Sequence, residues 1–258
     1  MRVIDNQRTG VKCKDLFHIP LEMRSIVKTQ RYSTPGYPCL YMGNSVYACW
    51  EEMGRPTMHN CWFSRIKTTN DIKLLDLRVP SKSKFKNLPI LWATLFPIII
   101  ACMIPVKDTT AIFKPEYIFP QLILEWIISN KSYNGIYYSS THKNTEFEYP
   151  DDKSYNIVIP VRNPLQSNGF CPNLKKTFHI SFPINFEIEN LRDPFPIDMG
   201  IYEINEDNMP DEIQLILDPE IEERPYTAEY LRRLILYAFS DFGQVERRLL
   251  SQPVRTVE

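Results

Sequence analysis

Short apolar runs alternate with turn residues along the first part of the chain. Pro35-Gly36 is a turn dipeptide, and the apolar run Pro38–Met42 after it predicts a short strand. Ser45 is a helix-capping residue type, and it predicts a helix over Val46–Met53 that Gly54 ends. The same criteria predict later strands at Asn60–Ile66, Lys73–Val79, Ile136–Ser139, Asn156–Val161 and Phe178–Phe186, and helices at Pro115–Ser129 and Thr227–Leu250.

One apolar segment stands out because Leu88–Val106 contains no charged residue. Its length approaches that of a membrane-spanning helix, which needs about 20 apolar residues. Lysines flank both ends, so the segment has no positive-inside asymmetry. We expect a buried core helix, or a strand and a helix broken at Pro97, and keep a membrane span as the alternative.

Composition and cysteine spacing exclude several classes of protein. The net charge of −1 argues against a nucleic-acid-binding surface, and the 43% hydrophobic and 24% charged residues are typical of a globular protein. The polar start Met1–Gly10 has no apolar signal core, and the six cysteines include no CxxC pair. We therefore expect reduced, mostly buried thiols and a cytoplasmic protein. The 21 prolines disfavour a bundle of long helices.

Common catalytic and cofactor motifs are missing from the sequence. It contains no P-loop, GxGxxG, HExxH or GxSxG, and the four histidines have no metal-ligand spacing. We therefore expect no metal site.

Candidate chemistry concentrates between residues 31 and 52. Arg31 lies at the mouth of a turn, Tyr41 at the end of the predicted strand and Glu52 on the helix that follows. A turn, a strand and a helix that fold back on each other would bring the three side chains together. The alternative is a solvated turn arginine, a core aromatic residue and a charge on the helix surface.

The spacing of two motifs resembles the RES domain family. The first motif comprises Arg31, Gly36, Pro38, Leu40-Tyr41, Ser45 and Glu52. The second comprises Gln121 and, further on, Gly135-Ile136-Tyr137-Tyr138-Ser139-Ser140, which places Ser140 at the family serine. The similarity extends over about Phe17–Pro160. Because Glu51 precedes Glu52, a register shifted by one residue stays open.

This resemblance implies a fold and an activity. RES proteins are toxins of bacterial toxin–antitoxin pairs with an α+β, ADP-ribosyltransferase-like fold, in which curved mixed β-sheets and flanking helices surround an NAD cleft. The resemblance implies cleavage of the nicotinamide–ribose bond of NAD by hydrolysis or phosphorolysis, with NAD as substrate and an antitoxin as partner. Residues 1–190 would form the RES-like catalytic domain. Residues 191–258 would form an acidic, proline-rich excursion and a C-terminal helix packed on the same domain.

The resemblance also assigns roles to individual residues. Glu52 would stabilise an oxocarbenium-like transition state, and Arg31, alone or with Arg24, would hold the pyrophosphate. Tyr41 would stack on nicotinamide, while Ser45 and Ser140 would bind substrate.

Three alternatives stay open. Ser140 could instead be a strand-end serine that satisfies backbone groups. The chain could be a protein ADP-ribosyltransferase, or a non-catalytic NAD-binding or interaction protein. The number of subunits, including a homo-oligomer, is not determined by the sequence.

Overall fold

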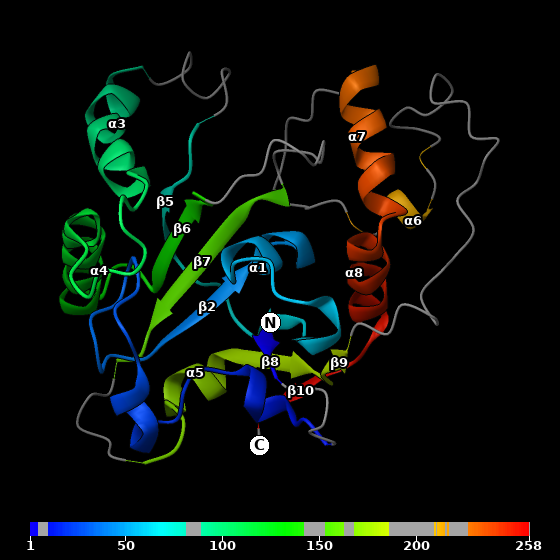
Figure 1. Ribbon diagram of the computed structural model, residues 1–258, viewed down its shortest axis with the longest axis horizontal. Helices are drawn as coiled ribbons and strands as arrows, with labels where there is room; N and C mark the ends of the chain where they lie inside the picture. Colours follow the sequence, from blue (N-terminus) through cyan, green and yellow to red (C-terminus); the bar gives the residue numbers. More distant parts are fainter. Residues whose placement is uncertain are drawn as a thin grey trace.

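The computed structural model describes residues 1–4, 10–80, 89–141, 153–162, 168–185, 209, 211–214, 216 and 227–257. It has a mixed α+β architecture in which three small sheets are flanked by helices (Figure 1). Most of the expected acidic, proline-rich excursion after residue 190 lies outside these residues.

The largest sheet has four strands in the order β2 (Cys39–Gly43), β7 (Tyr155–Pro160), β6 (Gly135–Ser139) and β5 (Leu74–Leu77). The pairs β2–β7 and β7–β6 are antiparallel, whereas β6 and β5 are parallel. Each strand agrees with one expected from the apolar pattern. This sheet positions most of the candidate functional residues.

Two three-stranded antiparallel sheets complete the β-structure. The first has the order β1 (Arg2–Val3), β3 (Cys61–Phe63) and β9 (Ile184–Asn185). The second has the order β10 (Val254–Thr256), β8 (Phe178–Ser181) and β4 (Ile66–Thr68). The strands expected at Asn60–Ile66 and Phe178–Phe186 are therefore each divided between the two sheets.

Short helices connect these strands. The 3-10 helices are η1 (Cys13–Leu16), η2 (Leu21–Ile26), η3 (Met58–Asn60) and η4 (Pro115–Tyr117). The α-helices are α1 (Val46–Glu52), α3 (Pro89–Met103), α4 (Ile118–Ser129), α5 (Pro172–Thr177), α6 (Asp211–Gln214), α7 (Ala228–Ala238) and α8 (Asp241–Ser251).

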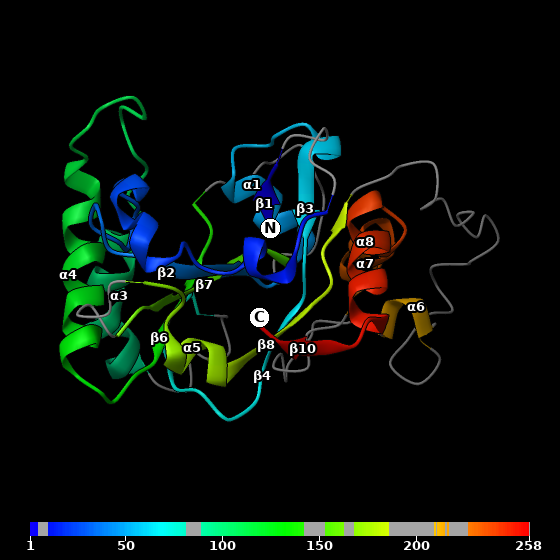
Figure 2. The ribbon, with the colours of Figure 1, turned by 90° about the horizontal axis from the view of Figure 1, so that it is seen from below.

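The apolar segment forms one continuous helix, α3, with Pro97 inside it. Of the two expected forms, the helix is confirmed, and the alternative of a strand and a helix broken at Pro97 is wrong. Expected burial of the segment is also wrong for most of it, because Ile99 and Cys102 are the buried residues of α3. The helix uses those two side chains to pack with α4 on one face of the four-stranded sheet, and Figure 2 shows both helices at one edge of the molecule. None of the described helices combines the length and the apolar character required to span a membrane.

Two C-terminal helices replace the one expected at Thr227–Leu250. Thr227 caps α7 by accepting from the backbone N–H of Tyr230 over 3.2 Å. A second cap interrupts the helix, because Ser240 Oγ accepts from the N–H of Gly243 over 3.3 Å and begins α8. The turn allows α7 and α8 to pack against each other.

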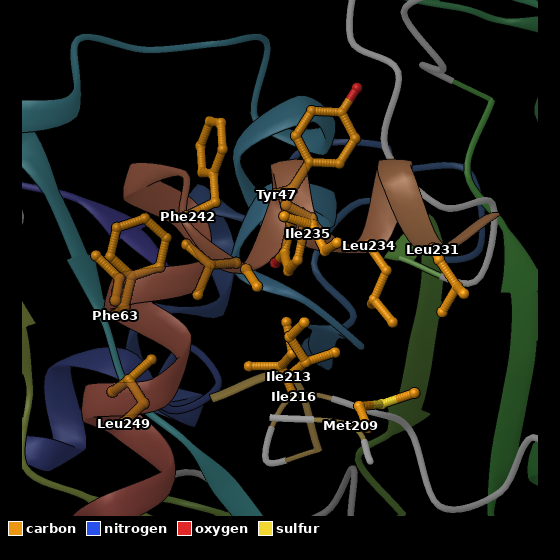
Figure 3. Packing of buried hydrophobic residues seen from close by; sticks show 14 of the residues in the cluster. Tyr47, Phe63, Met209, Ile213, Ile216, Leu231, Leu234, Ile235, Phe242 and Leu249 are labelled. Carbon is orange, nitrogen blue, oxygen red and sulfur yellow. The ribbon is translucent and has the colours of Figure 1, made fainter. Parts of the chain in front are cut away.

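The C-terminal helices share a hydrophobic core with α1 and β3. Tyr47, Phe63, Leu234 and Phe242 are buried members of this core, and Figure 3 shows how its side chains are distributed among the helices. A buried polar group adds to the packing. Glu246 of α8 accepts from the N–H of Val46 at the start of α1 over 3.2 Å and pairs with Lys153 Nζ at 2.9 Å. The C-terminal helices therefore help to hold α1, which ends in Glu52.

The cysteines are unpaired in the structure, as expected. Four of the six, Cys13, Cys61, Cys102 and Cys171, are buried, and Cys39 and Cys49 are partly buried. Burial raises the pKa of the Cys39 thiol to about 12 and that of the Cys102 thiol to about 11. Both thiols are therefore protonated at neutral pH, as is typical of structural rather than reactive cysteines.

Candidate functional site

Glu52 is held in place by two donors from the sheet. It is the last residue of α1, a helix that Ser45 caps by accepting from the N–H of Ala48 over 2.9 Å. Asn156 Nδ2 donates to Glu52 Oε2 over 2.9 Å, and Ser140 Oγ donates to the same oxygen over 3.3 Å. Both donors are buried, with 3% of their surface exposed. The carboxylate is thus fixed against β7 and the end of β6.

The tight connection between β2 and α1 depends on a glycine. A Cβ atom at Gly43 would lie 2.8 Å from Cys49 Sγ and 3.0 Å from the Cys49 nitrogen. Only glycine allows the strand and the helix to approach so closely. The close turn returns the chain along the sheet and brings Glu52 over the strand that contains Asn156.

Arg31 is buried, with 7% of its surface exposed, so the solvated-turn interpretation is wrong. Nη1 donates to the carbonyl oxygens of Cys102 and Ile104 over 2.9 and 3.0 Å. Nη2 donates to Thr141 Oγ1 over 3.1 Å. Arg31 therefore joins the loop before β2 to the end of α3 and to the residue after Ser140.

Tyrosines fill the space around these two charged groups. The guanidinium carbon of Arg31 lies 5.2 Å from the centre of the Tyr117 ring, within the range of a cation–π contact. Tyr41 donates from its hydroxyl to Ser33 Oγ over 3.1 Å. The rings of Tyr32 and Tyr138 lie 4.5 Å apart, centre to centre. Arg31 and Glu52 thus contact the adjacent residues Thr141 and Ser140 just after β6, and Tyr41 lies in the middle of β2 in the same sheet.

The electrostatics of the cluster keep these phenols neutral. Burial raises the pKa of Tyr138 well above its ordinary value, and the negative charge of Glu52 raises it further. Burial also raises the pKa of Tyr41 and Tyr117; Glu52 adds to both, and Arg31 opposes the rise at Tyr117. At neutral pH the tyrosines are therefore hydroxyl donors.

Gln121 supports the loop that contains Arg31. Its amide nitrogen donates to the carbonyl oxygen of Gln30 over 2.9 Å and to Thr29 Oγ1 over 3.0 Å. These contacts join α4 to the residues immediately before Arg31. Gln121 belongs to the second of the two sequence motifs, and in the structure it holds the loop before Arg31 in place.

The remaining candidates lie elsewhere. Ser45 is at the opposite end of α1 from Glu52, where its hydroxyl caps the helix and donates to the carbonyl oxygen of Lys153 over 2.6 Å. Arg24 is exposed on η2. Glu51 is buried and pairs with Arg55 at 3.2 Å, so the two adjacent acids have different surroundings. Glu52, and not Glu51, therefore belongs to the cluster with Arg31.

Asn156, Tyr117 and Thr141 were not singled out from the sequence. Asn156 had a local signal, because it is a buried amide in a strand of aliphatic residues. The sequence around Tyr117 and Thr141 contains no local signal of this kind, because their contacts with Arg31 span 86 and 110 residues of sequence.

Two hollows lie near this cluster, and Tyr41 lines the first of them. A cavity of about 300 Å³ beside β2 and α8 is lined by Ser45, Phe63 and Glu246, among others, and a groove of about 370 Å³ lies between α3, α4 and β5. Glu52 and Arg31 line neither of them. In the described part of the chain, no group of three His, Cys, Asp or Glu residues could hold a metal ion.

The chain is thus a mixed α+β protein in which a carboxylate and an arginine contact adjacent residues after strand β6, with tyrosines nearby. It is similar to a protein of Bacillus subtilis (strain 168) described as "Putative toxin YopC". The two sequences are 41% identical over 191 residues, which cover 67% of this chain and 43% of that protein. The chain therefore spans less than half the length of this relative. No protein-family model and no solved structure matches the chain.

Proposed function

We propose that this protein is a toxin that cleaves the nicotinamide–ribose bond of NAD. The observation that carries the proposal is the fixed carboxylate of Glu52, which two neutral donors hold beside Arg31 and the tyrosines. The similarity to a protein described as a toxin supports the biological role. The resemblance of the Arg31–Glu52 and Gln121–Ser140 motifs to the RES family supports the substrate and an ADP-ribosyltransferase-like arrangement of the sheets.

The proposed chemistry needs little acid catalysis. Nicotinamide leaves as a neutral molecule and takes the electron pair of the C–N bond, so positive charge develops on the ribose. The Glu52 carboxylate stabilises that charge, and water adds to the ribose carbon and releases one proton. The products are nicotinamide, ADP-ribose and a proton. When phosphate replaces water, the product is ADP-ribose 1″-phosphate.

Ser140 and Asn156 act as positioning residues in this mechanism. Both donate to Oε2 of Glu52, so the second oxygen, Oε1, is the one that we assign to the ribose. A carboxylate fixed before the reaction needs no reorientation as charge develops, and preorganisation of this kind is a large source of catalysis.

Arg31 is assigned to the pyrophosphate. A guanidinium has five N–H donors, and three of them donate to acceptors in the described part of the chain. The remaining two are a match for phosphate oxygens. The half-buried Tyr41 and Tyr117 supply aromatic surfaces on which a nicotinamide or adenine ring can stack.

The proposal is tested by incubating the purified chain with NAD and measuring free nicotinamide and the ribose product. We expect nicotinamide and ADP-ribose in equal amounts, with the phosphorylated product appearing only if phosphate can replace water. Induced expression in bacteria should lower cellular NAD and stop growth. Unchanged NAD in both experiments would overturn the proposal. An antitoxin that covers the Glu52 site is the partner that we propose for such a toxin.

A further inference from the structure

The helices α3 and α4 expose an unusual amount of apolar surface. Its centre consists of Ile90, Phe96 and Ile100 on α3 and Phe119, Leu122 and Trp126 on α4, each between 41% and 83% exposed. We call this surface the apolar helix face. Eleven of the eighteen exposed large apolar residues in the described part of the chain lie between Pro89 and Trp126. The exposure is therefore concentrated in one part of the fold.

The size of the face exceeds what a monomer usually exposes. Eight of these eleven residues lie on the two helices themselves and are about half exposed, so at about 200 Å² for a large side chain they present about 800 Å². The largest apolar patch on a typical monomer measures about 300–600 Å². A stable protein interface buries about 800 Å² on each partner. The face is thus large enough for a dimer interface.

The face also has the shape that self-association needs. The groove of about 370 Å³ runs between the two helices, with Leu95 and Ile98 on one side and Phe119 and Trp126 on the other. The exposed Phe96 and Ile100 follow on the same helix, α3, as one side of the groove. Because each copy has both a ridge and a groove on this helix pair, the ridge of one copy can pack into the groove of the other about a two-fold axis.

The charge pattern favours a second copy over other partners. The helix α3 contains no charged residue, and α4 contains one, Glu125. Permanent homodimers have the most apolar interfaces, whereas partners that are selected by charge need charged positions. Helices that lie on a membrane surface carry lysines and arginines along a polar face, and α3 and α4 have none.

We propose that the apolar helix face is the interface of a homodimer of this chain. The helices α3 and α4 lie on the side of the molecule opposite α7 (Figure 1). The proposal is independent of the reaction at Glu52, because it rests on exposed side chains that the reaction does not use.

The test is the mass of the full chain in solution, measured by light scattering during size-exclusion chromatography. We expect the wild type at twice 30.4 kDa, and Leu122→Glu at the mass of one chain. A carboxylate buried in an apolar interface should raise the dimer dissociation constant about 100-fold or more. Ile100→Arg tests the other helix in the same way. The matched control is Leu236→Glu, at an exposed leucine of α7, which should stay dimeric.

Circular dichroism distinguishes a folded monomer from an unfolded variant, and two substitutions on different helices keep the test decisive. A wild type that has the mass of one chain at micromolar concentration would overturn the proposal. So would a dimer that survives both charged substitutions. Flotation of a monomeric wild type with vesicles of anionic lipid, or a stable complex with a different protein through the same face, would assign the surface to another occupant.

Discussion

Asn156 donates from its side-chain amide to Glu52 Oε2 over 2.9 Å, and so connects strand β7 to the end of helix α1. The contact spans 104 residues of sequence and is buried at the amide. Because the Asn156 amide is neutral, it holds one carboxylate oxygen of Glu52 without placing a second charge beside it. The direction of the Glu52 carboxylate therefore depends on the amide at position 156.

Asn156→Asp tests this dependence. Two carboxyl groups at hydrogen-bond distance cannot both be ionised easily, so the substitution should raise the pKa at which the pair loses its second proton. We expect nicotinamide release at neutral pH to fall about 10-fold or more, with activity partly restored at higher pH. Asn130→Asp is the control, because Asn130 Oδ1 already acts as an acceptor for the N–H of Ser132 far from Glu52. Identical pH profiles for the wild type and Asn156→Asp would refute the positioning role.

Arg31 should affect binding more than turnover. Arg31→Lys keeps the charge but loses the planar group that donates to Cys102, Ile104 and Thr141. We expect KM for NAD to rise about 10–100-fold, as for the loss of one charged hydrogen-bonding pair, with a smaller fall in kcat. Arg24→Ala is the control, because Arg24 is exposed on η2. Loss of NAD binding in Arg24→Ala, with normal binding in Arg31→Ala, would move the pyrophosphate site to η2.

The buried pair of Lys153 and Glu246 should matter for stability. Glu246→Gln leaves the Lys153 ammonium buried without its charged partner, which costs about 3–5 kcal/mol in comparable pairs. The free energy of unfolding in urea gives the measure. Glu229→Gln is the matched control, because Glu229 pairs with Arg233 at the surface of α7 and its loss should hardly change stability. Equal effects of the two substitutions would mean that Glu246 does not support α1.

His18 should make the fold sensitive to acid. Burial lowers the pKa of its ring below 6.5, and the neutral ring accepts from the N–H of Cys171 at Nε2 over 2.9 Å. Below pH 6.5 the unfolded chain binds a proton at this position more readily than the folded chain does. The free energy of unfolding should therefore decrease as the pH is lowered. His18→Gln should reduce this dependence, and His59→Gln, at an exposed position of η3, should not. A pH dependence that persists in full without His18 would show that other groups cause it.

The sequence predicted the elements whose signals are local. Ser45 and Gly54 bracket α1, because a serine cap and a following glycine act on their own neighbours. The core strands of the large sheet were predicted to within a few residues for the same reason, since buried strands are apolar runs between turns. The division of the C-terminal segment at Ser240 was missed because the apolar periodicity continues across the cap.

Burial and long-range contact were less predictable. The apolar composition of α3 indicated a core helix, yet most of its side chains are exposed, because composition does not say which partners a surface will have. In the candidate site, Arg31, Tyr41 and Glu52 could be grouped because they lie within one turn, strand and helix. Asn156, Thr141 and Tyr117 join them from distant segments, and only the folded chain brings them there.

The most direct test of the proposed activity compares two adjacent carboxylates. Glu52 contacts Ser140 and Asn156, whereas Glu51 pairs with Arg55. At saturating NAD, Glu52→Gln should release nicotinamide about 10²–10³-fold more slowly than the wild type, as for the loss of one electrostatic contribution to the transition state. Glu51→Gln should stay close to the wild-type rate. An inactive Glu51→Gln beside an active Glu52→Gln, or a wild type that releases no nicotinamide, would contradict the account.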